Sequence, residues 1–490
     1  MVLAAVHLRL EEGIIKILHH YKSTKMKIFL TVAALLAVVS ASYSQAMGYQ
    51  DLALLFSQDD ANGTARFTSM SGAFGALGGD LSVMNINPAG LSVYNNSSFA
   101  GSFNSRSTDI TARYYGTSRK SQDQFLNLSQ AGAVLVFRNT YLSDWSKFAI
   151  GFNYKVAKDF TNGFEARGNS GVPTFRDFPL DDNTPTIDYN VAQEQRFFNN
   201  YTGEISEMNV AFSSIYKDKL HLGAALNFYD LNFSQRSTLV EFNRDEEGNT
   251  LDANLYQENF TSGGGISFNA GFIYKANENY RFGLSYQTPI LFSELLEESN
   301  ILENDGFMGD TEIIVSENLD FTYSNNVDEN GEDFFPSERR VFRLKTPSKL
   351  TASAAFIFGK KGLFSIDYIN KKYKNINLSN ANFSNENQFF QNELRNTHSF
   401  NLGSEWRFDR FSVRGGYKFE QSPDKLALDS DNLEGYSFGG GYDFGNVKLD
   451  FAYSDSNRTA PYNFYSGFDV NSANLLIDNR FFTTTITISL

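Results

Sequence analysis

The sequence predicts an all-β protein: a 14-stranded antiparallel transmembrane β-barrel whose lumen is plugged by an N-terminal hatch. Three observations predict it: a Gly-rich, non-periodic segment near the N-terminus, period-two alternation over most of the later chain, and short turns that alternate with long polar connections. Alternating strands joined by short turns at one end and long loops at the other are typical of outer-membrane barrels. Only a closed sheet crosses a bilayer without unpaired backbone groups.

Composition fits an exported β protein. Aromatic residues make up 15 % of the 490 residues, which argues against global disorder. There is no Cys, which excludes disulfides, thiolate metal sites and cysteine nucleophiles. Beyond residue 44 the chain has 37 basic and 54 acidic residues, a net charge of −17. Nucleic acid needs a basic footprint, so we expect no nucleic-acid partner.

Residues 1–44 are interpreted as an N-terminal extension and a signal peptide. Lys27 precedes an apolar run from Ile28 to Val39, and small residues follow it, which is the anatomy of a secretory signal. The run of 12 is shorter than the roughly 20 residues of a membrane-spanning helix. Met26 is the expected true start, with a genuine long extension as the alternative. We therefore expect export to the cell outer membrane.

Residues 45–96 are predicted to form the hatch. Glycines in the run from Gly72 to Gly79 let the backbone pass close to the wall, and Pro88 is expected to fix the turn into the first strand. Two charged residues are expected to fasten the hatch to the wall: Arg66 and Asp80, to Glu405, Arg407 or Arg414. The predicted hatch residues are Arg66, Gly72, Gly75, Gly78, Asp80, Asn87, Pro88, Ala89 and Gly90.

Residues 97–490 are predicted to form the barrel with long extracellular loops. From Phe400 to Phe419 apolar side chains occupy one face, and Glu405, Arg407, Arg414 and Lys418 occupy the other. Charges on the polar face indicate a solvated lumen, so the apolar face is expected to contact outer-membrane lipid and lipopolysaccharide. The last strand alternates up to Leu490 and is expected to pair with the first.

Six short turns imply fourteen strands when both chain ends are periplasmic. The turns are expected at 139–146, 217–219, 276–279, 359–362, 409–410 and 445–446. The strands are expected near 97–116, 129–138, 146–157, 206–216, 220–233, 263–275, 280–290, 348–358, 363–374, 397–408, 411–421, 434–444, 447–456 and 480–490. Long extracellular connections are expected at 158–205, 234–262, 291–347, 375–396 and 457–479, and shorter ones at 117–128 and 422–433.

One of the long connections has an apolar pattern. From Ile290 to Leu302, apolar residues recur three and four positions apart, which favours a short amphipathic helix. Such a helix either packs on neighbouring loops or presents an apolar patch that receives a ligand at the barrel mouth. On the second interpretation the substrate-binding residues are Phe292, Leu295, Leu296 and Ile301.

Three motifs carry a family resemblance. They are the hatch segment that ends in Asn87-Pro88-Ala89-Gly90-Leu91, the stretch Thr346-Pro347-Ser348-Lys349-Leu350, and the run Phe400–Phe419 followed by Ser422-Pro423 and a Gly-rich hairpin at 435–444. Because these three motifs follow one another in this order, the chain resembles the long-chain fatty-acid transporter (FadL) family of outer-membrane proteins. That family includes channels for aromatic hydrocarbons. The resemblance covers essentially the whole mature chain.

The resemblance implies passive uptake of hydrophobic compounds such as long-chain fatty acids, by a monomer. Extracellular loops, here 234–262 and 291–347 by their order, capture the ligand, which moves to a pocket inside the barrel and leaves past the hatch. In some members of the family the ligand leaves through a lateral opening at an inward kink in a wall strand. The alternative function is a plugged barrel that anchors or shuttles secreted proteins, as in type IX secretion, and long acidic loops favour it.

No enzyme chemistry, cofactor or metal is expected. The mature histidines are only His221 and His398, and neither has the partner pattern of a catalytic triad or a metal site. The run from Gly72 to Gly79 lacks the strand and acidic residue of a dinucleotide loop. The acidic segments 328–333 and 429–432 have oxygen ligands for calcium but lack the EF-hand spacing, so solvated loops are the simpler interpretation.

Overall fold

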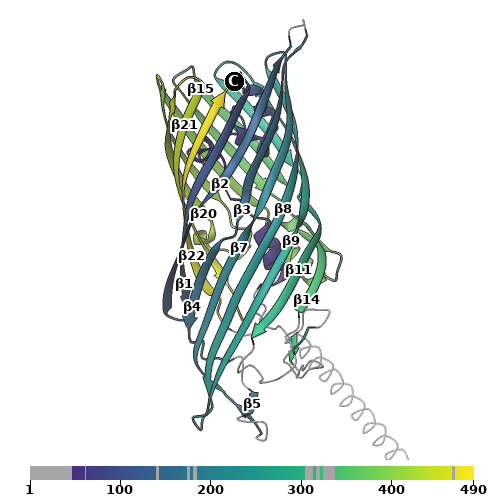
Figure 1. The fold of residues 1–490 in the computed structure, drawn as a ribbon, viewed down its shortest axis with the longest axis vertical. Coiled ribbons are helices and arrows are strands. Elements are labelled where there is room, and N and C mark those ends of the chain that lie inside the picture. The colour runs from purple at the N-terminus through teal and green to yellow at the C-terminus, as the bar shows by residue number, and fades with distance from the viewer. Residues whose placement is uncertain are drawn as a thin grey trace, which may run out of the picture.

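The computed structural model describes residues 47–60, 62–139, 143–173, 177–179, 185–303, 313–315, 321–323, 337–465 and 470–490. The predicted signal peptide, Gln45 and the acidic segment 328–333 lie outside the described residues. Figure 1 shows a single tall barrel that encloses the N-terminal helix. The C-terminus lies at the end of the barrel that carries the short turns. At the opposite end of the barrel, several long strands extend outward.

Fourteen strands of the described chain close into an antiparallel barrel, as predicted. In pairing order they are β1 (Ser98–Tyr114), β2 (Thr117–Arg138), β3 (Trp145–Asp159), β7 (Val191–Tyr216), β8 (Leu220–Arg244), β9 (Thr250–Lys275), β10 (Tyr280–Gln287), β15 (Lys349–Phe358), β16 (Gly362–Lys371), β18 (Thr397–Phe408), β19 (Phe411–Glu420), β20 (Leu433–Asp443), β21 (Val447–Tyr462) and β22 (Ala473–Ser489). All six predicted short turns join neighbouring strands. β22 pairs with β1 from Ser489 opposite Ser98 to Asn474 opposite Arg113, which closes the sheet.

Short strands in the outer connections extend this sheet. They are β4 (Asn162–Gly168), β11 (Leu291–Glu303), β14 (Ser337–Lys345) and β17 (Asn377–Ser379). Two separate hairpins are β5 (Asp177–Pro179) with β6 (Thr186–Asp188), and β12 (Ile313–Val315) with β13 (Phe321–Tyr323). The connections also hold α4 (Ser384–Asn392), η3 (Tyr373–Asn375) and η4 (Asp429–Asp431), which takes up the second acidic segment. Among the described residues no helix is long and apolar enough to cross a membrane.

A belt of apolar side chains surrounds the barrel. On β10 the outward residues Tyr280, Phe282, Leu284 and Tyr286 are exposed, and the same holds for β18 and β20. The inward face carries hydrogen-bonded amides instead: Asn209 Nδ2 donates to Asn227 Oδ1 at 2.7 Å. Apolar side chains outside and a polar lumen inside are the arrangement of a membrane barrel.

The strands continue beyond this belt. β7 and β9 have 26 residues each, whereas spanning a bilayer takes about 9–11. The expected loops at 117–128, 158–205 and 234–262 are therefore wrong in large part, because β2, β4, β7, β8 and β9 occupy them. Many outward residues of the extended β8 and β9 strands are charged, for example Arg236 and Asp252, so the apolar-outward pattern weakens while the backbone ladder continues.

The expected amphipathic helix at 291–302 is also wrong: this segment is β11, which pairs with β9 and β14. A bulge explains the misleading pattern. Phe292 lies opposite Leu344 and Leu295 opposite Phe342, so three steps on β11 match two on β14. An extra residue in one strand places side chains three apart on the same face, which imitates helical spacing.

Four short helices form the hatch: α2 (Tyr49–Phe56), α3 (Ala65–Thr68), η1 (Leu81–Asn85) and η2 (Pro88–Val93). Asn87 caps η2 and its Nδ2 donates to Gly75 O at 2.8 Å and Phe272 O at 3.0 Å. Pro88 begins this helix, and β1 starts ten residues later, so Pro88 does not lead directly into a strand. A Cβ on Gly75 would lie 2.0 Å from Ser353 Oγ, so only glycine permits this close approach to the wall.

Charged side chains hold the inner hatch against the wall. Arg66 Nε donates to Glu405 Oε2 at 2.7 Å, and Glu405 also binds Arg414 and Arg407. On the neighbouring strand, Asp367 Oδ2 accepts from the backbone N–H groups of Phe74 and Gly75, each at 2.9 Å. Asp80 differs from the expectation, because it caps η1 and accepts from Thr64 Oγ1 at 2.7 Å, both within the hatch.

Reversing the charge at Arg66 should loosen the hatch. In Arg66→Glu a second carboxylate faces Glu405, which is 1 % exposed and keeps Arg414 and Arg407, so an attraction between hatch and wall becomes a buried like-charge repulsion. We expect ionic conductance across planar bilayers to rise severalfold, whereas Arg66→Lys stays near the native level. Arg410→Glu makes the same charge change on an exposed periplasmic turn and serves as the control. Unchanged conductance in Arg66→Glu would contradict this role.

Candidate functional site

A cavity of about 730 Å³ lies in the outer half of the lumen. One side is α2, whose Tyr49, Leu54 and Leu55 line it. The other sides come from the inward faces of β1, β21 and β22 and from the end of β3 with the start of β4. α2 also contacts α4 of an outer connection, and Glu386 and Phe389 of α4 line the cavity as well.

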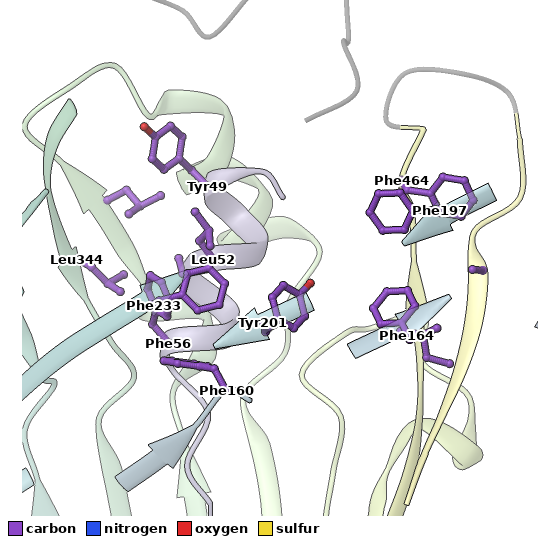
Figure 2. Close-up of a cluster of buried hydrophobic side chains, with 14 of the residues drawn as sticks. Tyr49, Leu52, Phe56, Phe160, Phe164, Phe197, Tyr201, Phe233, Leu344 and Phe464 are labelled. Atoms are coloured by element: carbon purple, nitrogen blue, oxygen red, sulfur yellow. The ribbon is translucent and has the colours of Figure 1, made fainter. Parts of the chain in front are cut away.

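Aromatic and aliphatic side chains line much of this cavity. Figure 2 shows two groups of rings that stand apart, one around α2 and one at Phe164, Phe197 and Phe464. In the first group Phe56 and Phe233 meet edge to face at 5.3 Å, and in the second Phe197 stacks on Phe464 at 4.7 Å. The apolar residues that line the cavity include Phe160, Phe164, Tyr201, Leu475, Ile477 and Phe481. An apolar molecule would bury surface here, at about 25 cal/mol per Å².

Charged groups line the inner end of the cavity, and most of them are paired. Lys158 Nζ is 3.0 Å from Asp60 Oδ1, and Arg106 is 3.4 Å from Asp159. Burial alone would raise the pKa of Asp60, but Lys158 and Arg106 outweigh it and hold that pKa below its usual range. Asp60 is therefore ionised at neutral pH.

Arg458 differs from Lys158 and Arg106, which pair with carboxylates. Its guanidinium lines the cavity and donates to the amide oxygen of Gln58 at 3.1 Å. Within the described residues it makes no ion pair with a carboxylate. A half-buried guanidinium that binds only a neutral amide can accept an anionic or strongly polar group of a ligand.

Asp51 adds a titratable carboxyl to the same space. It lies in the first turn of α2, and its side chain opens into the cavity. Asp51 is exposed to the cavity space, but the enclosing walls remove much of the hydration of its carboxyl, and this desolvation raises the pKa of Asp51 to about 6. The cavity therefore gains a negative charge as the pH rises through 6.

The wall next to the cavity has a seam without ladder hydrogen bonds. β2 pairs with β3 only from Gln130 opposite Lys155 to Arg138 opposite Lys147. Farther out, residues 117–129 of β2 pair with β1, while β4 pairs with β7. We call the boundary between residues 117–129 and residues 156–168 the seam. Its inner edge residues Lys158, Asp159 and Phe160 also line the cavity.

Side chains close the seam where backbone pairing is missing. Gly163 N donates to Asp123 Oδ2 at 2.7 Å, and Arg106 Nη1 donates to Asp159 O at 3.0 Å. Phe160 separates β3 from β4, and its ring is buried in the lumen. On the outer surface beside the seam, Leu126 is 72 % exposed. The ladder between neighbouring wall strands is therefore interrupted beside the cavity.

The predicted substrate residues do not line the cavity. Phe292 and Leu295 face the lumen from β11 but are fully buried in the hydrophobic cluster that includes α2. Leu296 faces the opposite side of the strand, and the side chain of Ile301 lies outside the described residues. The cavity residues come from segments far apart in the sequence, and several lie in stretches that were interpreted as loops. Only the aromatic content of the stretches 160–164 and 462–464 was a usable signal.

Neither histidine forms a catalytic or metal site in the described part of the chain. His221 Nδ1 lies 2.7 Å from Ser92 Oγ, and His398 Nδ1 lies 2.6 Å from Tyr368 Oη. No group of three or more potential metal ligands occurs among the described residues.

Comparison with known proteins agrees with this architecture. The sequence profile of the family described as outer membrane protein transport protein (OMPP1/FadL/TodX) matches residues 37–460. A FadL homologue from Pseudomonas aeruginosa has a TM-score of 0.57 and 14 % identity, over 88 % of this chain and 99 % of that one. The toluene transporter TodX from Pseudomonas putida has a TM-score of 0.51 and 14 % identity, over 89 % and 100 %. The CymD monoaromatic hydrocarbon channel has a TM-score of 0.51 and 13 % identity, over 88 % and 98 %.

No curated protein sequence matches the chain. At such low identities the structural likeness establishes the fold, and the match over residues 37–460 establishes the family. The chain therefore belongs to the OMPP1/FadL/TodX family, whose β-barrels transport hydrophobic compounds across the outer membrane.

Proposed function

We propose that this protein takes up amphiphiles with a long apolar body and an anionic end, such as long-chain fatty acids. The observation that carries the proposal is the cavity of about 730 Å³, whose walls combine apolar side chains with polar and charged groups that include Arg458. The apolar body of the ligand contacts Phe160, Phe164 and Ile477, and its anionic end pairs with Arg458. Aromatic hydrocarbons, which the names of TodX and CymD indicate for those proteins, would use the apolar surface alone.

Passage needs no covalent chemistry. The ligand enters from the outer connections, binds beside α2, and leaves through the seam into the outer leaflet. The proximity of Lys158, Asp159 and Phe160 to both the cavity and the seam supports this route over passage past the firmly fastened hatch. The apolar belt contacts membrane lipid and lipopolysaccharide, and we expect a monomer because the closed sheet leaves no free edge in the membrane.

The alternative is that the barrel anchors or shuttles secreted proteins. The long outer sheet of β7, β8 and β9 and the acidic balance of the chain favour it. Co-purification of secreted proteins, together with a lack of saturable binding of any apolar ligand, would establish this function in place of uptake.

Replacing Arg458 separates anionic ligands from neutral ones. In Arg458→Gln we expect the affinity for palmitate to fall at least about tenfold, because hydrogen bonds to charged groups contribute about 1.5–3 kcal/mol. The affinity for hexadecanol should stay nearly unchanged. Fluorescence displacement titrations measure both, and Arg410→Gln, on the exposed periplasmic turn, is the matched control. Equal losses for palmitate and hexadecanol would contradict an anion contact at Arg458.

Asp51 should make binding of anionic ligands pH-dependent. Because the pKa of Asp51 is raised to about 6, its carboxyl is mostly neutral at pH 5 and ionised at pH 7.5. Hexadecyl sulfate stays ionised throughout this range, so its affinity should fall as the pH rises. In Asp51→Asn the dependence should disappear. A pH dependence that persists unchanged in this variant would show that another group titrates.

A cross-link tests the lateral route directly. The chain has no cysteine, and Gly163 N bonds to the Asp123 carboxylate across the seam. We expect the oxidised Asp123→Cys/Gly163→Cys variant to bind palmitate but to lose most of its uptake into cells. Reduction by dithiothreitol should restore uptake, which makes the reduced protein its own control. Full uptake with the disulfide formed would exclude the seam as the exit.

A further inference from the structure

Two exposed cations lie on the outer surface of β14. Its residues Phe342 and Leu344 are buried in the hydrophobic cluster inside the barrel. Because successive side chains of a strand point to opposite faces, Arg343 and Lys345 point outward, and both are exposed. Arg343 Nε donates to the backbone carbonyl of Ser293 at 3.2 Å. Among the described residues neither cation makes an ion pair with a carboxylate, and both Nη groups of the guanidinium are free.

These cations lie at the outer edge of the apolar belt. β9, β11 and β14 follow one another around the wall (Figure 1). On β9 the outward side chains are apolar from Tyr274, next to a short turn, to Ile266, a span of nine residues. Crossing a bilayer takes about 9–11 residues. Ile266 lies opposite Leu291 of β11, and Leu291 lies opposite Lys345, so Lys345 is level with the outer end of this span. Arg343 lies two residues farther out.

Polar and apolar side chains surround the two cations. Asn377 and Ser379 of β17 lie opposite them, and both are exposed and can donate hydrogen bonds to an anion. On the other side of β14, the side chain of Leu291 is 50 % exposed. Deeper in the belt, Tyr286 of β10 and Leu350 of β15 lie opposite each other with exposed side chains. The cationic surface therefore continues directly into an apolar one.

On other strands the outer edge of the belt is acidic. The first charged side chains beyond the apolar outward residues of β8 and β21 are Asp230 and Asp455. The chain beyond residue 44 has a net charge of −17. Glu294 in the bulge of β11 is exposed as well, but it forms no ion pair with the cations of β14 in the described structure. The two cations are therefore an exception in surroundings that otherwise repel anionic headgroups.

We propose that Arg343 and Lys345 bind a phosphate group of lipid A, the phosphorylated glycolipid of the outer leaflet. The guanidinium can hold two phosphate oxygens through its Nη groups, and the ammonium adds a second positive charge. The acyl chains of the lipid then lie against Tyr286, Leu291 and Leu350. The site faces the membrane and not the lumen, so the proposal is independent of the proposed uptake.

Charge complementarity and continuity with the belt favour a lipid over free phosphate. An exposed ion pair with a dissolved phosphate contributes little, because water and salt screen it. A headgroup is instead held at this height by its own acyl chains, so it meets the cations at a high effective concentration. At a lipid surface each Lys or Arg adds to the attraction for anionic headgroups. The same two cations therefore bind a membrane phosphate better than a dissolved one.

Lipid adducts counted by native mass spectrometry test the site. The purified full chain, in a non-ionic detergent, is titrated with diphosphoryl lipid A and with the same lipid after removal of both phosphates. For the native protein we expect the diphosphoryl form to bind at least about tenfold more tightly, the equivalent of one charge-assisted hydrogen bond. In Arg343→Gln/Lys345→Gln the two forms should bind equally. Arg343→Lys should retain part of the preference, because lysine keeps the charge but not the planar fork.

A matched control makes the same charge change at the opposite edge of the belt. Lys360→Gln/Lys361→Gln removes two exposed cations from a short turn and should keep the native preference. The site would be overturned by a native protein without preference, by a preference that survives in Arg343→Gln/Lys345→Gln, or by an equal loss in the control. Adducts of inorganic phosphate at the same concentration, in place of the lipid, would indicate a site for free phosphate and would also overturn the proposal.

Discussion

Closure of the sheet between β22 and β1 is the constraint on which the rest of the structure depends. In a bilayer each unpaired backbone group costs several kcal/mol, so the barrel must close completely across the membrane. Complete closure by fourteen strands leaves a wide lumen, and a hatch fills it. The inward face then has to bind that hatch, which explains why Glu405 and Asp367 lie on membrane strands yet are almost fully buried. Charges that would be intolerable toward lipid are here paired with Arg66 and with backbone N–H groups.

Toward the outer edge of the apolar belt the constraint relaxes, and the seam occurs there. The seam begins above Gln130, where β2 no longer pairs with β3. Side chains such as Asp123 satisfy backbone N–H groups at this height, so an interrupted ladder costs less than it would deeper in the membrane. The cavity lies at the same level, where a ligand has access both to the outer medium and to the outer leaflet. The shared height of the seam and the cavity therefore fits the proposed route, in which the ligand leaves the cavity through the seam.

The sequence predicted much of the fold because the membrane imposes a simple pattern. Alternation from Phe400 to Phe419 and the short turns follow directly from a two-faced sheet, and they identified the strand number and the closure. The outer extensions of the strands were missed because many of their outward residues are charged, as at Arg236 and Asp252, and the apolar-outward alternation is lost. The helix expected at 291–302 failed because the bulge between Phe292 and Leu295 imitates helical spacing. The cavity could not be predicted, since Arg106, Phe160 and Arg458 meet only through the closure of the barrel. Arg66 of the hatch pairs with Glu405 of the wall, as expected, because opposite charges on the hatch and the inner wall have few other partners.

The central claim is that the cavity between α2 and the seam holds the apolar ligand. A crystal structure with 16-bromohexadecanoate tests it most directly, because bromine gives an anomalous signal at the end of the apolar chain. The account predicts a bromine peak among Phe160, Phe164 and Ile477, with the carboxylate density next to Arg458. A peak only on the outer apolar belt, or no peak in the cavity at saturating ligand, would contradict it.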